Sequence, residues 1–67
     1  MTKNEAITKA IARLVSKGQN AEQAAKILDE EILSAHWLSA DSTAYGLVHF
    51  GFCTKRQAPG FAAALGR

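Results

Sequence analysis

The sequence predicts a small all-α domain, made of a helical hairpin and one or two short C-terminal helices in a helix-turn-helix-like arrangement. Two observations support this fold class: apolar residues recur at helical spacing through residues 5–37, and residues that cap helices stand before or after the expected helices. The chain has 67 residues, enough for one domain, 1–67. Its content of 48% hydrophobic and 21% charged residues is that of a folded chain rather than a disordered one.

The first helix is expected over residues 5–17. Thr2 and Glu5 have the spacing of a capping box, in which each side chain bonds the other's backbone N–H, and Asn4 is an alternative cap. Gly18 suits the left-handed position that ends a helix. The apolar stripe consists of Ile7, Ala10, Ile11, Leu14 and Val15.

The second helix is expected over residues 21–37, with Asn20 as its N-cap and Gln23 three residues later. Because only Gly18 and Gln19 join the two helices, they should form an antiparallel hairpin. Small side chains would let the two helix axes approach closely: Ala10, Ala12, Ala21, Ala24 and Ala25. The larger apolar residues of the second helix are Ile27, Leu28, Ile32, Leu33 and Leu38.

Residues 43–53 fit two structures. A helix over 43–50, capped by Ser39 or Asp41, is favoured because Gly51 would then end it and Phe52 would contact Leu47. A strand is the alternative, because apolar residues also alternate over 48–53. A last short helix, Pro59–Leu65, is expected after the Pro-Gly turn signal and before Gly66.

Charge is distributed unevenly along the chain. Asp41 is the last acidic residue, and residues 42–67 carry Lys55, Arg56 and Arg67 with no carboxylate side chain. The formal net charge of +2 is mildly basic, which permits contact with nucleic acid without requiring it.

The segment Thr54–Gln57 is the predicted DNA-binding element. Thr54-Lys55-Arg56-Gln57 has the capping-box form, so a helix–glycine–turn–helix arrangement would place its last three residues where a recognition helix meets the major groove. Arg56 and Gln57 would contact bases, and Thr54, Lys55 and Arg67 would hold phosphates. Pro59 opposes this interpretation, because proline is unfavourable inside a helix, so a polar surface loop over 54–58 is the alternative.

The functional hypothesis is therefore a small cytoplasmic regulatory protein that binds DNA and regulates transcription. A chain this short often needs a staple, and its single cysteine, Cys53, excludes an internal disulfide, so a homodimer is one expectation. The rival hypothesis is an adaptor or inhibitor that docks a larger protein through an aromatic surface. That surface would comprise Trp37, Tyr45, Phe52 and Phe61, unless the phenylalanines fill the core.

Enzymatic function is not expected. His49 and Cys53 are four residues apart, but a third ligand and an orienting group are not evident, so neither a metal site nor a catalytic thiol is predicted. The acidic cluster Asp29-Glu30-Glu31 should be a solvated helix face. We expect no cofactor, no small-molecule substrate and no contact with a membrane, since no apolar run is long enough to span one. A lone thiol without a secretory signal fits the cytoplasm.

Overall fold

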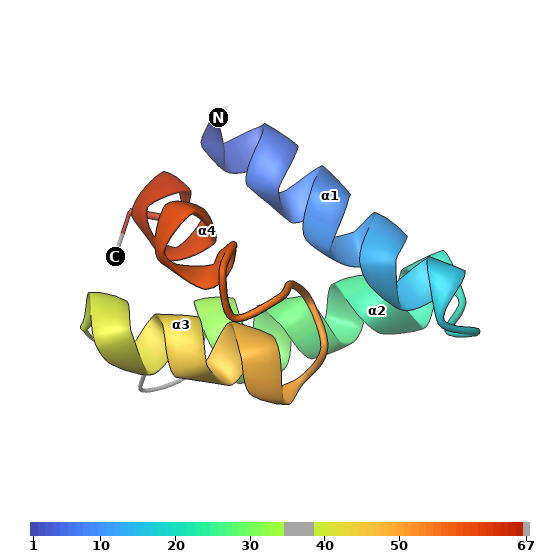
Figure 1. Cartoon of the computed structure of the whole chain (residues 1–67). Coiled ribbons are helices and arrows are strands. Elements are labelled where there is room, and N and C mark those ends of the chain that lie inside the picture. Colours follow the sequence, from blue (N-terminus) through green and yellow to red (C-terminus); the bar gives the residue numbers. More distant parts are fainter. Residues whose placement is uncertain (35–38, 67) are drawn as a thin grey trace.

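The computed structural model describes residues 1–34 and 39–66, and this part of the chain is all-helical, as predicted (Figure 1). The strand alternative for residues 48–53 is wrong, because helix continues to His49 and a turn follows it. The elements in chain order are α1 (Lys3–Ser16), α2 (Ala21–Leu28), the π-helical segment η1 (Asp29–Leu33), α3 (Ala40–His49) and α4 (Ala58–Ala64).

Helix α1 begins and ends as its capping signals predict, although it starts two residues earlier than expected. The Thr2 hydroxyl accepts a hydrogen bond from the Glu5 N–H at 3.1 Å, and a Glu5 carboxylate oxygen accepts one from the Thr2 N–H at 3.1 Å. Hydrogen bonding from the Thr2 backbone N–H, and then from the Thr2 side chain, to the charged carboxylate holds the pKa of Glu5 below its ordinary value. Gly18, at φ 106°, ends the helix.

The second predicted helix changes geometry partway along. The Asn20 side chain caps α2 by accepting from the Gln23 N–H at 2.7 Å, but regular α-helix ends at Leu28. The chain then widens into η1, and the Ser34 N–H bonds the Asp29 carbonyl five residues back at 2.8 Å. The predicted continuation over residues 35–37 lies outside the described residues.

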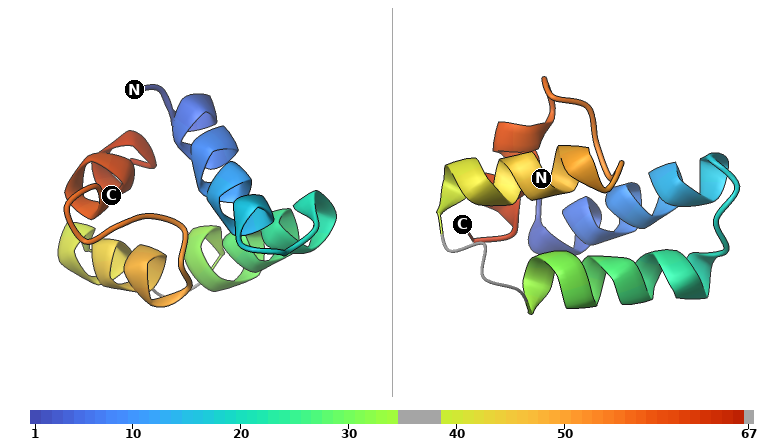
Figure 2. Two further views of the ribbon diagram at one scale, coloured as in Figure 1. Left: turned by 45° about the vertical axis from the view of Figure 1, so that its right-hand side comes forward. Right: turned by 90° about the horizontal axis from the view of Figure 1, so that it is seen from below.

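Helices α1 and α2 form the predicted hairpin, with α2 folded back along α1 (Figure 2). Ala10 and Ala24 are buried in it, as expected. The other alanines named above, Ala12, Ala21 and Ala25, are exposed because they lie on the solvent side of their helices. Val15 is also 42% exposed, so it does not belong to the buried stripe.

Helix α3 ends in the Schellman motif that the sequence predicts. The Phe52 N–H bonds the Leu47 carbonyl at 2.8 Å, and the Gly51 N–H bonds the Val48 carbonyl at 3.0 Å. Gly51 adopts φ 84°, the left-handed conformation that only glycine adopts without strain. At the other end Ser39, not Asp41, is the N-cap, and it exchanges hydrogen bonds with Ser42.

One core joins the four helices, and phenylalanines from the C-terminal half fill its centre. Phe52 is completely buried, and Phe61 is nearly so, because the alanine-rich hairpin leaves volume that only large side chains fill. The other buried apolar residues are Ala6, Ala10, Leu14, Ala24, Leu28, Ile32, Leu47, Cys53, Ala58, Ala62 and Leu65. No helix in the described ranges is both long and apolar enough to cross a membrane.

Candidate nucleic-acid interface

The segment Thr54–Gln57 forms a tight turn held by the predicted capping box. The Thr54 hydroxyl accepts from the Gln57 N–H at 3.2 Å, and the Gln57 Oε1 accepts from the Thr54 N–H at 3.0 Å. All four residues of the turn are exposed. In the right-hand view of Figure 2, the chain that leads into α4 projects beyond the helices.

The helix-turn-helix arrangement is not confirmed, because Lys55, Arg56 and Gln57 lie before α4 rather than on its first turn. The Ala58 N–H does bond the Thr54 carbonyl at 3.0 Å, as it would in a helix. The next residue is Pro59, which has no N–H and leaves the Lys55 carbonyl without its helical partner. Helix α4 therefore begins at Ala58, one residue before the predicted start, and Gly66 follows its end in a left-handed conformation.

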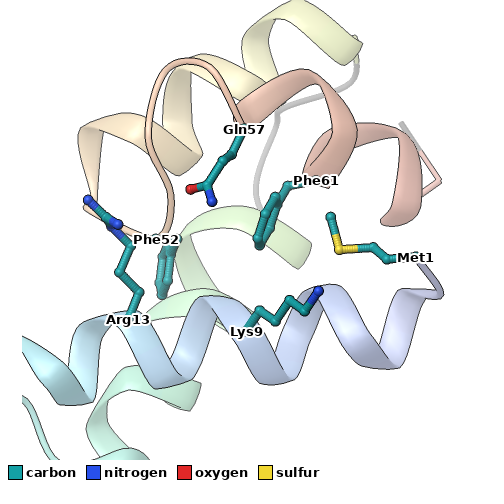
Figure 3. A pocket seen from close by; sticks show the side chains of 6 residues that line it. All are labelled: Met1, Lys9, Arg13, Phe52, Gln57 and Phe61. Carbon is teal, nitrogen blue, oxygen red and sulfur yellow. The ribbon is translucent and has the colours of Figure 1, made fainter.

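A hollow of about 420 Å³ lies between α1 and α4, beside this turn (Figure 3). Lys9 and Arg13 reach it from α1, and Gln57 reaches it from the opposite side. Its remaining lining is apolar: Met1, Phe52 and Phe61. No carboxylate is among these lining residues, so the hollow is electropositive.

The cations of α1 were missed as site residues by the sequence analysis. Lys9 and Arg13 on α1 and its C-cap Lys17 recur every four residues and therefore lie on one side of the helix, which is the signal that reveals them. Lys17 lies at the far end of this row, where its Nζ is 3.3 Å from the position that a Cβ on Gly51 would occupy. The three cations thus run alongside the segment between Gly51 and Gln57, with Lys17 beside Gly51 and with Lys9 and Arg13 beside the hollow that Gln57 lines.

Arg13 has an unusual environment. Its Nε is buried and has no hydrogen-bond partner among the described residues. The Arg13 charge also acts on the neighbouring thiol of Cys53, whose pKa is raised by burial and lowered, to a smaller extent, by Arg13.

The predicted base contact from Gln57 conflicts with the observed geometry. Bidentate pairing with adenine uses both the oxygen and the nitrogen of a glutamine amide. The Gln57 Oε1 is already engaged by the Thr54 N–H, so only Nε2 is left to donate. Thr54, by contrast, accepts through its hydroxyl oxygen and can still donate its hydroxyl hydrogen. Arg67 lies outside the described residues.

Within residues 1–34 and 39–66, Tyr45 is the one exposed ring of the alternative aromatic surface. Phe52 and Phe61 are buried in the core, so they cannot reach a partner without unfolding, and Trp37 lies outside the described residues. Tyr45 is 64% exposed, and its ring stacks on that of His49 at a centroid distance of 5.9 Å. It borders a second, largely apolar hollow of about 480 Å³, lined also by Asp41, Ala44, Val48, Lys55, Ala58 and Pro59.

His49 and Cys53 do not form a pair on one helix. Helix α3 ends at His49, which is exposed, whereas Cys53 is buried beyond the left-handed Gly51. Within the described residues, no three His, Cys, Asp or Glu side chains are grouped so as to hold a metal ion. Asp29, Glu30 and Glu31 are exposed on η1.

Comparisons with protein-family models, with curated proteins and with solved structures find no match to this chain.

Proposed function

We propose that this protein is a small regulatory protein that binds DNA through a basic surface on two elements. One element is the exposed turn with Lys55 and Arg56, and the other is α1 with its C-cap, which carries the row Lys9, Arg13 and Lys17. The observation that carries the proposal is the carboxylate-free hollow, which brings Lys9 and Arg13 beside the turn. Cations from two distant parts of the sequence thus lie on one surface. Such a surface can neutralise several neighbouring phosphates of DNA.

The charge distribution supports a defined orientation on DNA. The acidic residues Asp29, Glu30 and Glu31 are exposed on η1. In the right-hand view of Figure 2, η1 lies on the opposite side of the molecule from the projecting turn. DNA would attract the turn and repel η1, so electrostatics favours approach with the turn foremost.

Within this surface the residues have different roles. Arg56 is exposed on the turn and is the candidate for a base contact, because arginine pairs with guanine O6 and N7. Lys55, Thr54 and the α1 row hold phosphates, which position the protein without reading sequence.

The test is DNA affinity, measured by fluorescence anisotropy on mixed-sequence duplexes. Arg56→Ala should weaken binding by about 1–3 kcal/mol on a duplex that holds its preferred base. Lys26→Ala on α2 is the control, because it removes one exposed positive charge away from the proposed surface. Equal affinities for the two variants would contradict the assignment.

Tyr45 favours a second candidate function, the docking of a protein partner. A large exposed aromatic ring beside an apolar hollow is typical of an interface anchor. Under this alternative, Tyr45→Ala abolishes capture of the partner, and added salt has little effect on the complex. Under the DNA proposal, Tyr45→Ala leaves DNA affinity unchanged.

A further inference from the structure

We infer that the hollow beside Tyr45 is a self-association site, in which two copies of this chain pack face to face across a two-fold axis. This hollow, of about 480 Å³, lies between α3 and the chain that leads into α4. Each copy would occupy the hollow of the other. The inference gives the second candidate function a partner of defined chemistry, and it does not rest on DNA binding.

The two walls of the hollow carry opposite charges. Helix α3 forms one wall and contributes Asp41, whereas the turn and the start of α4 form the other wall and contribute Lys55 (Figure 1). Both side chains are exposed, and within residues 1–34 and 39–66 neither has an ion-pair partner. A hollow with an acid on one wall and a cation on the other is complementary to itself.

A two-fold rotation can bring the opposite charges together. When the axis runs along the hollow, each wall faces the other wall of the partner copy, so Asp41 meets the partner's Lys55 and the same pair forms a second time. An axis across the hollow would instead place like charges against each other, which is unfavourable. The charge pattern therefore selects one orientation of the two copies.

Apolar side chains lie between these charges and would form the centre of the interface. Tyr45 is 64% exposed on the α3 wall, and Ala44 and Val48 are half-buried beside it. In the selected orientation this wall lies over the partner's turn, so the Tyr45 ring would cover the partner's Pro59, which is also exposed. Burial of this apolar surface favours association, and tyrosine is enriched at protein interfaces.

The chain offers charge-reversal variants with matched controls. Asp41→Lys and Lys55→Glu each place like charges against each other at both pairs. Glu22→Lys is the control for the first, because Glu22 is the second residue of α2 as Asp41 is of α3. Lys26→Glu, at an exposed position of α2, is the control for the second. Neither Glu22 nor Lys26 lines the hollow, and each control changes the net charge as its counterpart does.

The experiment is sedimentation equilibrium of each protein over about 10 µM to 1 mM, with circular dichroism to verify folding. Wild type and both controls should dimerise in this range. The dimer dissociation constant should rise about tenfold or more in Asp41→Lys and in Lys55→Glu. An equimolar mixture of these two variants should associate about as tightly as wild type, because each pair in the mixed dimer then joins opposite charges.

Tyr45→Ala tests the same interface without a change of charge. Removal of the ring should raise the dissociation constant about tenfold or more, because exposed aromatic anchors dominate interface energies. This variant alters only an exposed side chain, so it decides the question alone where a charge variant does not fold. Dimerisation of Tyr45→Ala as tight as that of wild type would overturn the inference.

Two further results would also overturn it. One is a wild-type chain that stays monomeric up to about 1 mM, which would leave the hollow to a partner of another sequence. The other is a mixture of Asp41→Lys and Lys55→Glu that associates no more tightly than either variant alone. Lys55 also belongs to the proposed DNA-binding surface, so DNA affinities are compared at concentrations at which the chain is monomeric. Dimerisation without DNA binding would contradict only the proposed function, and DNA binding without dimerisation would contradict only this inference.

Discussion

Thr54 and Gln57 cap each other's backbone N–H groups across the turn that precedes α4, at 3.2 Å and 3.0 Å. This reciprocal pair has two consequences. It fixes the turn that presents Lys55 and Arg56, and it orients the Gln57 amide so that its nitrogen is left to donate toward α1. A local capping motif thus shapes the proposed binding surface.

Loss of the Thr54 cap should destabilise the fold. Thr54→Ala removes the hydroxyl that accepts the Gln57 N–H, and such losses cost about 0.5–2 kcal/mol. Urea denaturation measures the change in the free energy of unfolding. Thr54→Ser keeps the hydroxyl and should stay within about 0.5 kcal/mol of wild type. Equal destabilisation by alanine and serine would show that the hydrogen bond does not matter.

Two glycine-to-alanine substitutions should change stability in opposite directions. Gly51 has φ 84°, so Gly51→Ala forces an L-residue into the left-handed region at about 1–2 kcal/mol. Gly60 lies within α4 with no atom within 4 Å of an added Cβ, so Gly60→Ala should stabilise by about 0.5–1 kcal/mol. Thermal unfolding should show a lower melting temperature for Gly51→Ala and a higher one for Gly60→Ala. A Gly51→Ala variant more stable than wild type would refute the Schellman ending of α3.

Cys53 should make stability depend on alkaline pH. Its pKa is raised in the folded protein, chiefly by burial, so the unfolded thiol ionises first as the pH rises. The thiol therefore stabilises the fold fully below its unfolded pKa, and this contribution is lost as the pH rises through the folded pKa. Cys53→Ala lacks this dependence, so the stability gap between wild type and variant should narrow at alkaline pH. A constant gap in urea denaturation would contradict the burial of the thiol.

Phe52 should be indispensable to folding. Removing a buried phenylalanine costs about 3–5 kcal/mol, whereas a domain of this length has about 3–10 kcal/mol in total. Phe52→Ala should therefore lose cooperative thermal unfolding, monitored by circular dichroism. The control Val15→Ala alters a partly exposed side chain and should remain close to wild type. A cooperative transition at the wild-type temperature in Phe52→Ala would exclude Phe52 from the core.

The sequence predicts those features whose causes are local. The helix caps at Thr2 and Asn20, the reciprocal Thr54–Gln57 bonds and the left-handed ends at Gly18 and Gly51 each depend on a few neighbouring residues, and the structure contains all of them, although Thr54 holds a turn and does not cap α4. The start of α4 at Ala58, rather than directly after Thr54, also has a local cause, the missing N–H of Pro59.

The features that the sequence did not predict depend on contacts between distant elements. Lys9 and Arg13 are ordinary helix cations until α4 lies opposite α1 and Gln57 is turned toward them. Likewise the widening of η1 at Asp29 does not follow from the apolar spacing, because the spacing of Leu28 and Ile32, both buried, is equally that of a regular α-helix. Burial of Phe61 against the hairpin, too, is decided by tertiary packing.

The salt dependence of DNA binding by the wild-type protein is the most direct test of the central claim. Affinity for a mixed-sequence duplex is measured by fluorescence anisotropy over a series of salt concentrations. A surface of Lys9, Arg13, Lys17, Lys55 and Arg56 that neutralises about three to five phosphates predicts a slope of log K against log[salt] of about −3 to −4.5. Absence of binding at low salt, or an affinity that salt does not change, would contradict DNA binding through this surface.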